Sequence, residues 1–371
     1  MDKKTTIYVR NKEITPSSYY RIIQYSRKFN HNVKIRSIAP TSIYKMHLNS
    51  DKEKLNSKFI GAVYFLNMMF RVTFFLIVDI FDKPDFVILS KTFLPRYCPN
   101  YLLKLIDVLT RRSVFIWDFD DHIFKSGEIS LKEAKLLENN SDRIIVTNDF
   151  LKDQISIENK EKVKLLPTTD GDLQGFKQEE LMLNRKKTFH KTINLVWVAT
   201  AGNLHHLSEI IETLDEAAVK VLIELKKELK LTVVCNKPLN AKTKNIIVRN
   251  VKWSRFGAKD EIYSSHIGIM PLINDEYSLG KGGFKLVQYI STGLPVIASN
   301  VGFNEEIINN NCGILVNDML DKSVWIDAII KIASSEDVWE RYSNSSLARW
   351  HEKFSYDNNL NFWKAILNDI K

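Results

Sequence analysis

Two glycines and two lysines stand close together in the run GKGGFKLVQYISTGLPVIASNVGFNEE, residues 280–306. Their types and spacing suit the binding of a phosphate group. A helix that begins near Gly282 would present unpaired backbone N–H groups, and Gly282 and Gly283 would let an anion approach that backbone closely. Lys281 and Lys285 are four residues apart and share one helix face, with Gln288 about one turn further along. A solvated basic helix end is the alternative interpretation.

The composition is that of a folded protein with anionic partners. The chain has 371 residues, of which 44% are hydrophobic and 26% charged, and this length allows two domains with separate cores. Its 53 Lys and Arg exceed its 44 Asp and Glu, and the net charge of +9 favours nucleotide phosphates or lipid headgroups as partners. No helix-turn-helix, zinc-finger or aromatic RNA-binding signature is present, so nucleic acid is not expected as a partner.

The three cysteines, Cys98, Cys235 and Cys312, lack the paired spacing of a zinc site and are expected to be buried free thiols. No signal peptide precedes the first strand-like run, TTIYVR, which favours a cytoplasmic location.

One apolar segment, residues 59–81, is almost long enough to cross a bilayer. Asn67, Arg71 and Asp79 interrupt it and would form a narrow polar stripe on a helix. Three interpretations stay open: a helix packed on a sheet, a helix that also touches an anionic membrane surface, and a true span, which Arg71 and Asp79 would make costly.

Strand-like and helix-like segments alternate through the first part of the chain. Helices are expected near Pro16, over 59–81, and near Pro99, Ser130 and Asn148. Repeated strand–helix alternation indicates a parallel sheet with helices on both faces. The expected strands are 6–10, 33–38, 86–90, 114–119, 143–147 and 163–167.

A second series of the same kind follows a polar stretch at residues 168–191. Its helices are expected over 203–228, 282–292 and 320–333. We therefore expect an α/β protein of two tandem, doubly wound Rossmann-like domains, 1–167 and 192–350, facing each other across a cleft, with 168–191 as the connection and 351–371 as a helix that could cross back. The expected strands are 193–198, 231–235, 245–249, 266–270, 294–299 and 312–316.

The run at 280–306 resembles the donor-site signature of glycosyltransferases of the GT-B fold, family 4 of the carbohydrate-enzyme classification. The likeness lies in its glycine-rich turn, its helix, the Gly-x-Pro before a strand and the ending Gly-x-x-Glu. Further segments resemble the family in the expected order: PSSYYRIIQY (16–25), WDFDDHIF (117–124), NNSDRIIVTNDFL (139–151) and WVATAGNLHHL (197–207).

The resemblance implies a role for each matching residue. Lys285, or Lys281, would neutralise the donor β-phosphate; the alternative for each is a surface lysine. Donor contacts are implied for Thr200, Gly202, Asn203, Gly282, Gly283, Gln288, Glu305 and Glu306, with plain turn or capping roles as alternatives for the glycines, Asn203 and the two glutamates. Adjacent His205 and His206 are expected to point to different faces and not to share a metal.

Two departures from the family pattern stand out. Many members carry two glutamates eight positions apart, where this chain has Gly280 and Gln288. A glutamine can still bond a ribose hydroxyl, without the strength of a carboxylate. In the first domain Ser17 and Ser18 replace the usual glycines, and with Arg21 they are expected to line the acceptor pocket.

Asp118-Phe119-Asp120 spells the D-x-D pair with which another glycosyltransferase class holds a metal. The phosphate-binding features lie far downstream in another domain, so no metal and no cofactor is expected. At the end of the strand 114–119, Asp120, Asp121 or His122 could instead orient the acceptor hydroxyl or contact the transferred sugar. Capping of the following turn is the alternative.

The expected function is thus a retaining, metal-independent glycosyltransferase of bacterial surface polysaccharide synthesis. Its donor would be a nucleoside-diphosphate sugar, uridine-linked, and its acceptor a glycan or lipid-linked glycan at the inner face of the plasma membrane. Alternatives are a sugar-nucleotide epimerase or glycan phosphorylase of similar fold, and a degenerate partner subunit, which Gly280 and Gln288 favour.

Overall fold

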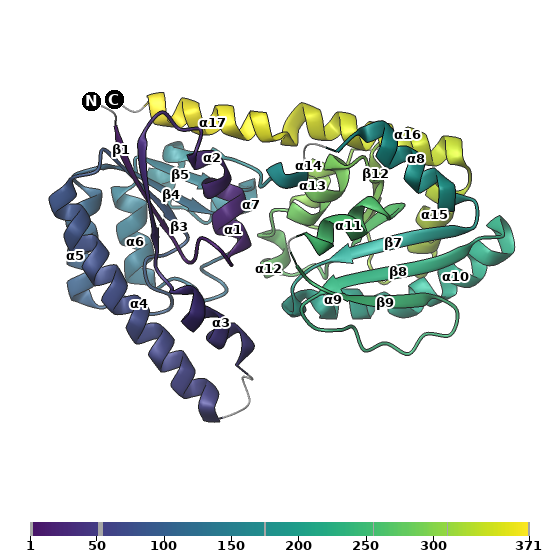
Figure 1. Cartoon of the computed structure of the whole chain (residues 1–371), viewed down its shortest axis with the longest axis horizontal. Coiled ribbons are helices and arrows are strands. Elements are labelled where there is room, and N and C mark those ends of the chain that lie inside the picture. The colour runs from purple at the N-terminus through teal and green to yellow at the C-terminus, as the bar shows by residue number, and fades with distance from the viewer. Residues whose placement is uncertain (1–2, 51–54, 174–175, 255, 310, 370–371) are drawn as a thin grey trace. The chain divides into compact units, whose positions relative to one another are not determined.

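The computed structural model describes residues 3–50, 55–173, 176–254, 256–309 and 311–369 (Figure 1). The chain divides into two compact units. Unit 1 comprises Met1–Thr168 and Asn359–Lys371, and unit 2 comprises Thr169–Asn358. The expected connection at 168–191 contributes residues 169–191 to unit 2, and the last residues of the chain belong to unit 1.

Unit 1 is built on a six-stranded parallel sheet in the order β2-β1-β3-β4-β5-β6. This confirms the first series of predicted strands. The strands β3 and β4 are almost wholly buried because helices cover both faces of the sheet. The strand bounds are β1 (Lys4–Val9), β2 (Asn32–Ser37), β3 (Phe86–Ser90), β4 (Val114–Phe119), β5 (Arg143–Val146) and β6 (Val163–Leu165).

Each helix expected in unit 1 is present, and one more, α3, was not expected. No residue of α3 is fully buried, so its sequence carries no clear apolar period. The helix after β1 includes a π-helical turn, Tyr19–Ile23. The helices are α1 (Pro16–Ser18), α2 (Gln24–Ser26), α3 (Thr41–Asn49), α4 (Leu55–Asp82), α5 (Asn100–Thr110), α6 (Leu131–Asn140), α7 (Asp149–Asp153) and α17 (Tyr356–Asp369), of which the last begins in unit 2.

The polar residues of α4 face the sheet. The fully buried Asp79 accepts a 2.6 Å hydrogen bond from the Tyr8 hydroxyl and pairs with the Arg36 guanidinium. Arg71 donates to the carbonyl oxygens of Ser37, at 2.9 Å, and Ile38, at 3.1 Å. Two residues of the expected polar stripe, Arg71 and Asp79, therefore bond to β1, β2 and the turn after β2, which fixes α4 to unit 1.

Unit 2 has the order β12-β11-β10-β7-β8-β9, again all parallel. All strands of the second series are confirmed, so the chain has the predicted α/β fold of two doubly wound units. The chain leaves β7 toward β8 and returns to its other side at β10, which makes the β7–β10 boundary a topological switch point. The strand bounds are β7 (Thr192–Val198), β8 (Glu228–Cys235), β9 (Ile247–Lys252), β10 (Ile267–Met270), β11 (Val296–Ser299) and β12 (Gly313–Val316).

The helices of unit 2 cover both faces of its sheet. Those in the expected places are α9 (Leu204–Glu209) and α10 (Ile211–Leu225), α13 (Phe284–Ser291) and α15 (Lys322–Ala333). Further helices are α8 (Gln178–Phe189), α11 (Gly257–Tyr263), α12 (Glu276–Leu279), α14 (Asn304–Ile307) and α16 (Glu336–Arg349).

A buried arginine joins three of these helices. Arg185 of α8 is 1% exposed and donates only to oxygens at helix ends: the carbonyls of Ile262 and Tyr263, both at 3.1 Å, and the carbonyl and hydroxyl of Thr292, at 2.8 and 2.9 Å. Burial lowers its pKa to about 9. A cation suits the carboxyl ends of α11 and α13, where carbonyls lack partners within the helix.

Replacing Arg185 by Met tests this junction. We expect the free energy of unfolding to fall by about 3 kcal/mol or more, because several buried carbonyls lose their donor at once. Chemical denaturation measures it, with the exposed Arg341→Met as the matched control. An R185M variant as stable as that control would show that the carbonyls find other donors.

Candidate functional site

Two turns meet at the carboxyl edge of the unit 2 sheet, on either side of its switch point. Thr200 and Asn203 follow β7, and Lys281 follows β10. The Asn203 amide donates to the Thr200 hydroxyl at 3.0 Å, and its Oδ1 accepts from the Lys281 ammonium group. Asn203 therefore bonds across the switch point and does not cap α9 with its side chain. The structure brings three predicted donor-site residues together at the place where such sheets bind ligands.

The backbone at Gly283 requires a glycine. Its φ of +61° lies in the left-handed region, and a Cβ atom there would stand 2.3 Å from Ile307 Cδ1. This turn starts α13, and the first turn of any helix presents backbone N–H groups that the helix itself does not use. A side chain at Gly202, by contrast, would meet nothing within 4 Å, so no steric reason for glycine is seen there.

A buried neutral histidine lies beside the two lysines. The pKa of His206 falls to about 3 because of burial, then of the positive charges of Lys281 and Lys285 nearby. Its Nδ1 accepts the backbone N–H of Ile273 at 3.1 Å, so its proton is on Nε2. Lys281 also lies 5.0 Å from the centre of the Tyr277 ring. The site thus gathers cations and neutral donors, which suits an anion.

Sequence reasoning missed the role of His206. The rings of His205 and His206 lie 3.9 Å apart, so the expectation that they point to different faces is wrong. Their adjacency drew attention only as a possible metal pair. No group of three or more His, Cys, Asp or Glu that could hold a metal occurs among the described residues.

The remaining predicted donor residues lie at the same edge or just behind it. Gln288 is 9% exposed, and its amide nitrogen donates to Asp170 at 2.8 Å. Burial raises the pKa of Asp170, and the hydrogen bond from Gln288 opposes that rise. Glu305 and Glu306 are exposed on the short helix α14, after β11.

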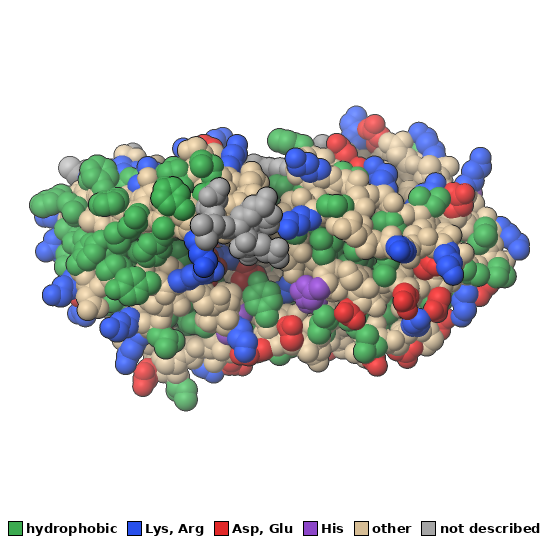
Figure 2. Space-filling view, turned by 90° about the horizontal axis from the view of Figure 1, so that it is seen from below, with side chains coloured by type: hydrophobic (Ala, Val, Ile, Leu, Met, Phe, Trp, Pro, Cys, Tyr) green, Lys and Arg blue, Asp and Glu red, His purple; other side chains and the backbone are tan. Residues whose placement is uncertain are grey.

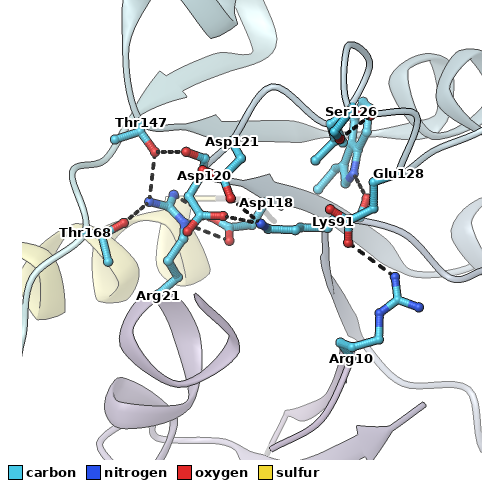
Figure 3. Close-up of polar contacts among 12 residues, drawn as sticks. Arg10, Arg21, Lys91, Asp118, Asp120, Asp121, Ser126, Glu128, Thr147 and Thr168 are labelled. Atoms are coloured by element: carbon cyan, nitrogen blue, oxygen red, sulfur yellow. Dashed lines mark hydrogen bonds and ion pairs between the residues drawn. The ribbon is translucent and has the colours of Figure 1, made fainter. Parts of the chain in front are cut away.

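In unit 1, a buried ion pair ties the strand ends together (Figure 3). The Arg21 guanidinium bonds both carboxylate oxygens of Asp118, with distances of 2.6 to 3.0 Å. It also donates to Thr168 Oγ1 at 3.0 Å and to the Leu166 carbonyl at 2.9 Å. Burial lowers the pKa of Arg21, but the carboxylate of Asp118 more than offsets this and raises it. Arg21 therefore braces the predicted acceptor side from within.

Lys91 is the main residue of unit 1 that sequence reasoning missed. It follows β3 with a φ of +66°, a conformation rarely adopted outside glycine, and its side chain is 14% exposed. Its ammonium lies 3.0 Å from Asp120 Oδ1 and 2.6 Å from Asp121 Oδ2 (Figure 3). Burial raises the pKa of Asp120, and Lys91 opposes that rise. Backbone strain carries no sequence signal in a lysine.

The loop that follows Lys91 is fixed by a second buried acid. Glu133 of α6 accepts from the Thr92 hydroxyl at 2.7 Å and from the Phe93 N–H at 2.8 Å, and burial raises its pKa to about 7. The backbone of Lys91 itself donates to the Asp118 carbonyl at 2.7 Å and accepts from Trp117 Nε1 at 2.7 Å. These bonds hold Lys91 in its strained conformation.

The other predicted residues of unit 1 lie near the same strand ends. His122 is buried against Phe150, with their ring centres 5.3 Å apart. Ser17 is partly buried and Ser18 fully buried in α1, after β1. The D-x-D carboxylates, Asp118 and Asp120, are each paired with a cation of the protein.

Comparison with known protein families gives a match within unit 2. Residues 196–335, which include Thr200, Lys285 and Glu305, match the family model described as "Glycosyl transferases group 1". A comparison with curated protein sequences found no match.

Solved structures resemble the chain over its whole length. Sucrose-phosphate synthase from Thermosynechococcus elongatus has a TM-score of 0.67 at 12% identity and covers 99% of both chains. HepE from Anabaena, in complex with UDP and glucose, has a TM-score of 0.63 at 10% identity, covering 99% of this chain and 100% of its own. WaaG, a glycosyltransferase involved in lipopolysaccharide biosynthesis, has a TM-score of 0.59 at 11% identity, covering 98% and 99%.

At these identities the structural likeness establishes the fold, and the family match lies within the second unit. The chain is a two-unit α/β protein of the GT-B fold, and its residues 196–335 match the model of the glycosyl transferases group 1 family.

Proposed function

We propose that this protein is a retaining, metal-independent glycosyltransferase of family 4 that takes a sugar from a uridine diphosphate donor. Its acceptor is a glycan or lipid-linked glycan of a bacterial surface polysaccharide, and it works in the cytoplasm at the inner face of the plasma membrane. The observation that carries the proposal is the set of Lys281, Lys285, Asn203 and His206 at the carboxyl edge of the unit 2 sheet.

The chemistry of this set suits a leaving diphosphate. Negative charge builds on the β-phosphate as the bond to the sugar breaks, so a cation beside it binds the transition state more tightly than the ground state. We assign this role to Lys285, with Lys281 as its partner. The Gly282-Gly283 turn and Thr200, Gly202 and Asn203 would contact the phosphates, and Gln288, Glu305 and Glu306 would contact the rest of the donor.

The acceptor side is assigned to unit 1. Asp120 and Asp121 would orient the acceptor hydroxyl or contact the transferred sugar, and Ser17 would line its pocket, whereas the predicted His122 and Ser18 are buried. Lys91 keeps Asp120 and Asp121 in place, and Arg21 keeps the strand ends in place, so both act as positioning residues.

The nucleotide and the pathway rest on structural neighbours. HepE has been crystallised with UDP and glucose and with UDP-glucose, and WaaG takes part in lipopolysaccharide biosynthesis. Both share only the fold with this chain, so the uridine base and the polysaccharide remain proposals.

One observation keeps a second candidate function open. The glutamate pair of many family members is replaced by Gly280 and Gln288, and the Gln288 amide is bonded to Asp170. A non-catalytic partner subunit of the same fold would show this pattern. It would bind a nucleotide, or none, and transfer no sugar.

The first test concerns Lys285. We expect Lys285→Ala to weaken UDP binding about tenfold or more, as the loss of one charge-assisted hydrogen bond would, and to leave uridine binding nearly unchanged. Nucleotide-dependent thermal stabilisation measures both, and the exposed Lys220→Ala serves as control. Equal losses for UDP and uridine would mean that Lys285 supports the fold only.

The second test concerns metal. Because Asp118 and Asp120 are paired with Arg21 and Lys91, we expect excess chelator to leave sugar transfer nearly unchanged. Abolition of transfer by chelator, with recovery on adding manganese, would refute the proposed mechanism.

The third test separates the two units. We expect Asp120→Asn to lower kcat about 100-fold or more, the scale of a positioned proton-transfer group, without changing UDP-dependent stabilisation. Lys91→Met should also lower kcat, because Asp120 and Asp121 lose their counter-charge. Since Lys91 holds down the pKa of Asp120, its loss should shift the pH profile of kcat to higher pH. Variants with normal kcat would remove these residues from the acceptor side.

A further inference from the structure

The apolar side of α4 points away from unit 1. Tyr64, Met68, Val72, Leu76 and Asp79 are buried, and Arg71 and Asp79 are bonded to unit 1 as described above. The opposite side of the same helix carries large exposed side chains: Phe59 (72% exposed), Val63, Leu66, Phe70 (70%), Phe74 (62%), Ile77 and Phe81 (80%). We call these seven residues the outer stripe. An ordinary surface helix has polar residues on its outer side.

The outer stripe is narrow, continuous and long. Its residues are spaced by four, three, four, four, three and four positions, which places them within roughly 80° of the helix circumference. It runs for about 33 Å along the axis. Figure 2 shows hydrophobic side chains gathered on the face of unit 1 where α4 lies. Contiguous apolar patches of this size on a protein surface mark an interaction site.

A transmembrane orientation of α4 does not fit its contacts. Residues Ser57–Asp82 are long and apolar enough to cross a membrane, and only 22% of their most apolar window is buried. However, Arg71 and Asp79 are held by Ser37, Ile38, Tyr8 and Arg36 of the same unit. Spanning would break these bonds and place both charges in hydrocarbon. Lying in the plane of a membrane keeps them.

The distribution of charge identifies the partner. Residues 1–168 and 359–371 contain 30 Lys and Arg against 20 Asp and Glu, a net charge of +10, whereas residues 169–358 contain 23 against 24, a net charge of −1. The whole positive charge of the protein therefore resides in the unit that carries the outer stripe. An anionic surface attracts such a unit.

Groups typical of a membrane interface surround the stripe. Tyr97 and Tyr101 are exposed, and the Tyr101 hydroxyl lies 3.4 Å from Thr73 of α4. Exposed Lys45, Lys58 and Lys104 lie on α3, α4 and α5, and Met46 and Leu48 of α3 are exposed as well. Two kinds of side chain commonly lie at the level of the lipid headgroups: aromatic rings with a polar end, such as tyrosine, and long cationic side chains, such as lysine.

We infer that the outer stripe is a docking surface for an anionic lipid bilayer, with α4 lying in the membrane plane and inserting its four phenylalanines among the headgroups. This docking surface does not depend on the proposed catalysis. Its use, to bring unit 1 to a lipid-linked acceptor, rests on the proposed function.

Flotation of the full chain with vesicles tests the inference. Vesicles of phosphatidylglycerol and phosphatidylcholine are compared with pure phosphatidylcholine, at low and high salt. We expect flotation with the anionic vesicles, reduced by salt because the electrostatic part is screened. Phe70→Ser combined with Phe74→Ser should lower the partition coefficient about tenfold or more per phenylalanine removed.

The matched control is Leu131→Ser combined with Ile157→Ser. These two residues are in unit 1, are 85% and 86% exposed and lie outside α4, so this variant should float like the unmodified protein. A protein that never floats, or an F70S/F74S variant that floats as well as the control, overturns the inference. A dimer in solution that F70S/F74S dissociates, with no flotation, would assign the stripe to a second copy of the chain and also overturn it.

Nucleotide binding distinguishes this result from a failure of the proposed function. The F70S/F74S variant should keep the thermal stabilisation by UDP, since the stripe is in unit 1 and the predicted donor residues are in unit 2. Flotation without any response to UDP would uphold the docking surface and refute the proposed donor.

Discussion

The bidentate pair of Arg21 and Asp118 is the interaction on which the carboxyl edge of unit 1 depends. Both side chains are almost inaccessible, so each would carry a large desolvation cost without the other. The guanidinium also reaches the ends of β5 and β6, and its own backbone carbonyl accepts from Trp363 of α17 at 3.0 Å. Arg21, in the helical segment after β1, therefore fixes the positions where β4 and β5 end. Asp120 and Asp121 follow β4, and Thr147 follows β5. Arg21 engages both carboxylate oxygens of Asp118, and Lys91 balances Asp120.

The strands were predictable because a parallel sheet covered on both faces requires short, nearly continuous apolar runs. All twelve expected runs form strands, in two parallel sheets. Helices without a strong apolar period were not predictable. Residues 168–191 look like a polar connection, yet the end of that stretch forms α8, whose charged Arg185 is buried because helix carbonyls surround it.

Some features of the candidate site were likewise predictable from the sequence, and others were not. The glycine turn and its lysines follow from residue type and spacing, and Gly283 indeed needs its positive φ. Lys91 could not be found, because its importance comes from a left-handed backbone held by Glu133 and Trp117, residues distant in sequence. The tautomer of His206 depends on a backbone donor, Ile273, across the switch point. Such contacts exist only once the fold has formed.

The orientation of α4 could not be predicted from the hydrophobic period of its sequence alone. Sequence reveals a polar stripe opposite a wide apolar face, and for a soluble helix the apolar face is expected inward. In unit 1 the inward side of α4 combines buried apolar residues with Asp79, and Tyr8, Arg36 and two backbone carbonyls provide partners for Asp79 and Arg71. Once these bonds form, the phenylalanines can only face outward. The buried polar contacts of the sheet thereby determine which surface the protein offers to its surroundings.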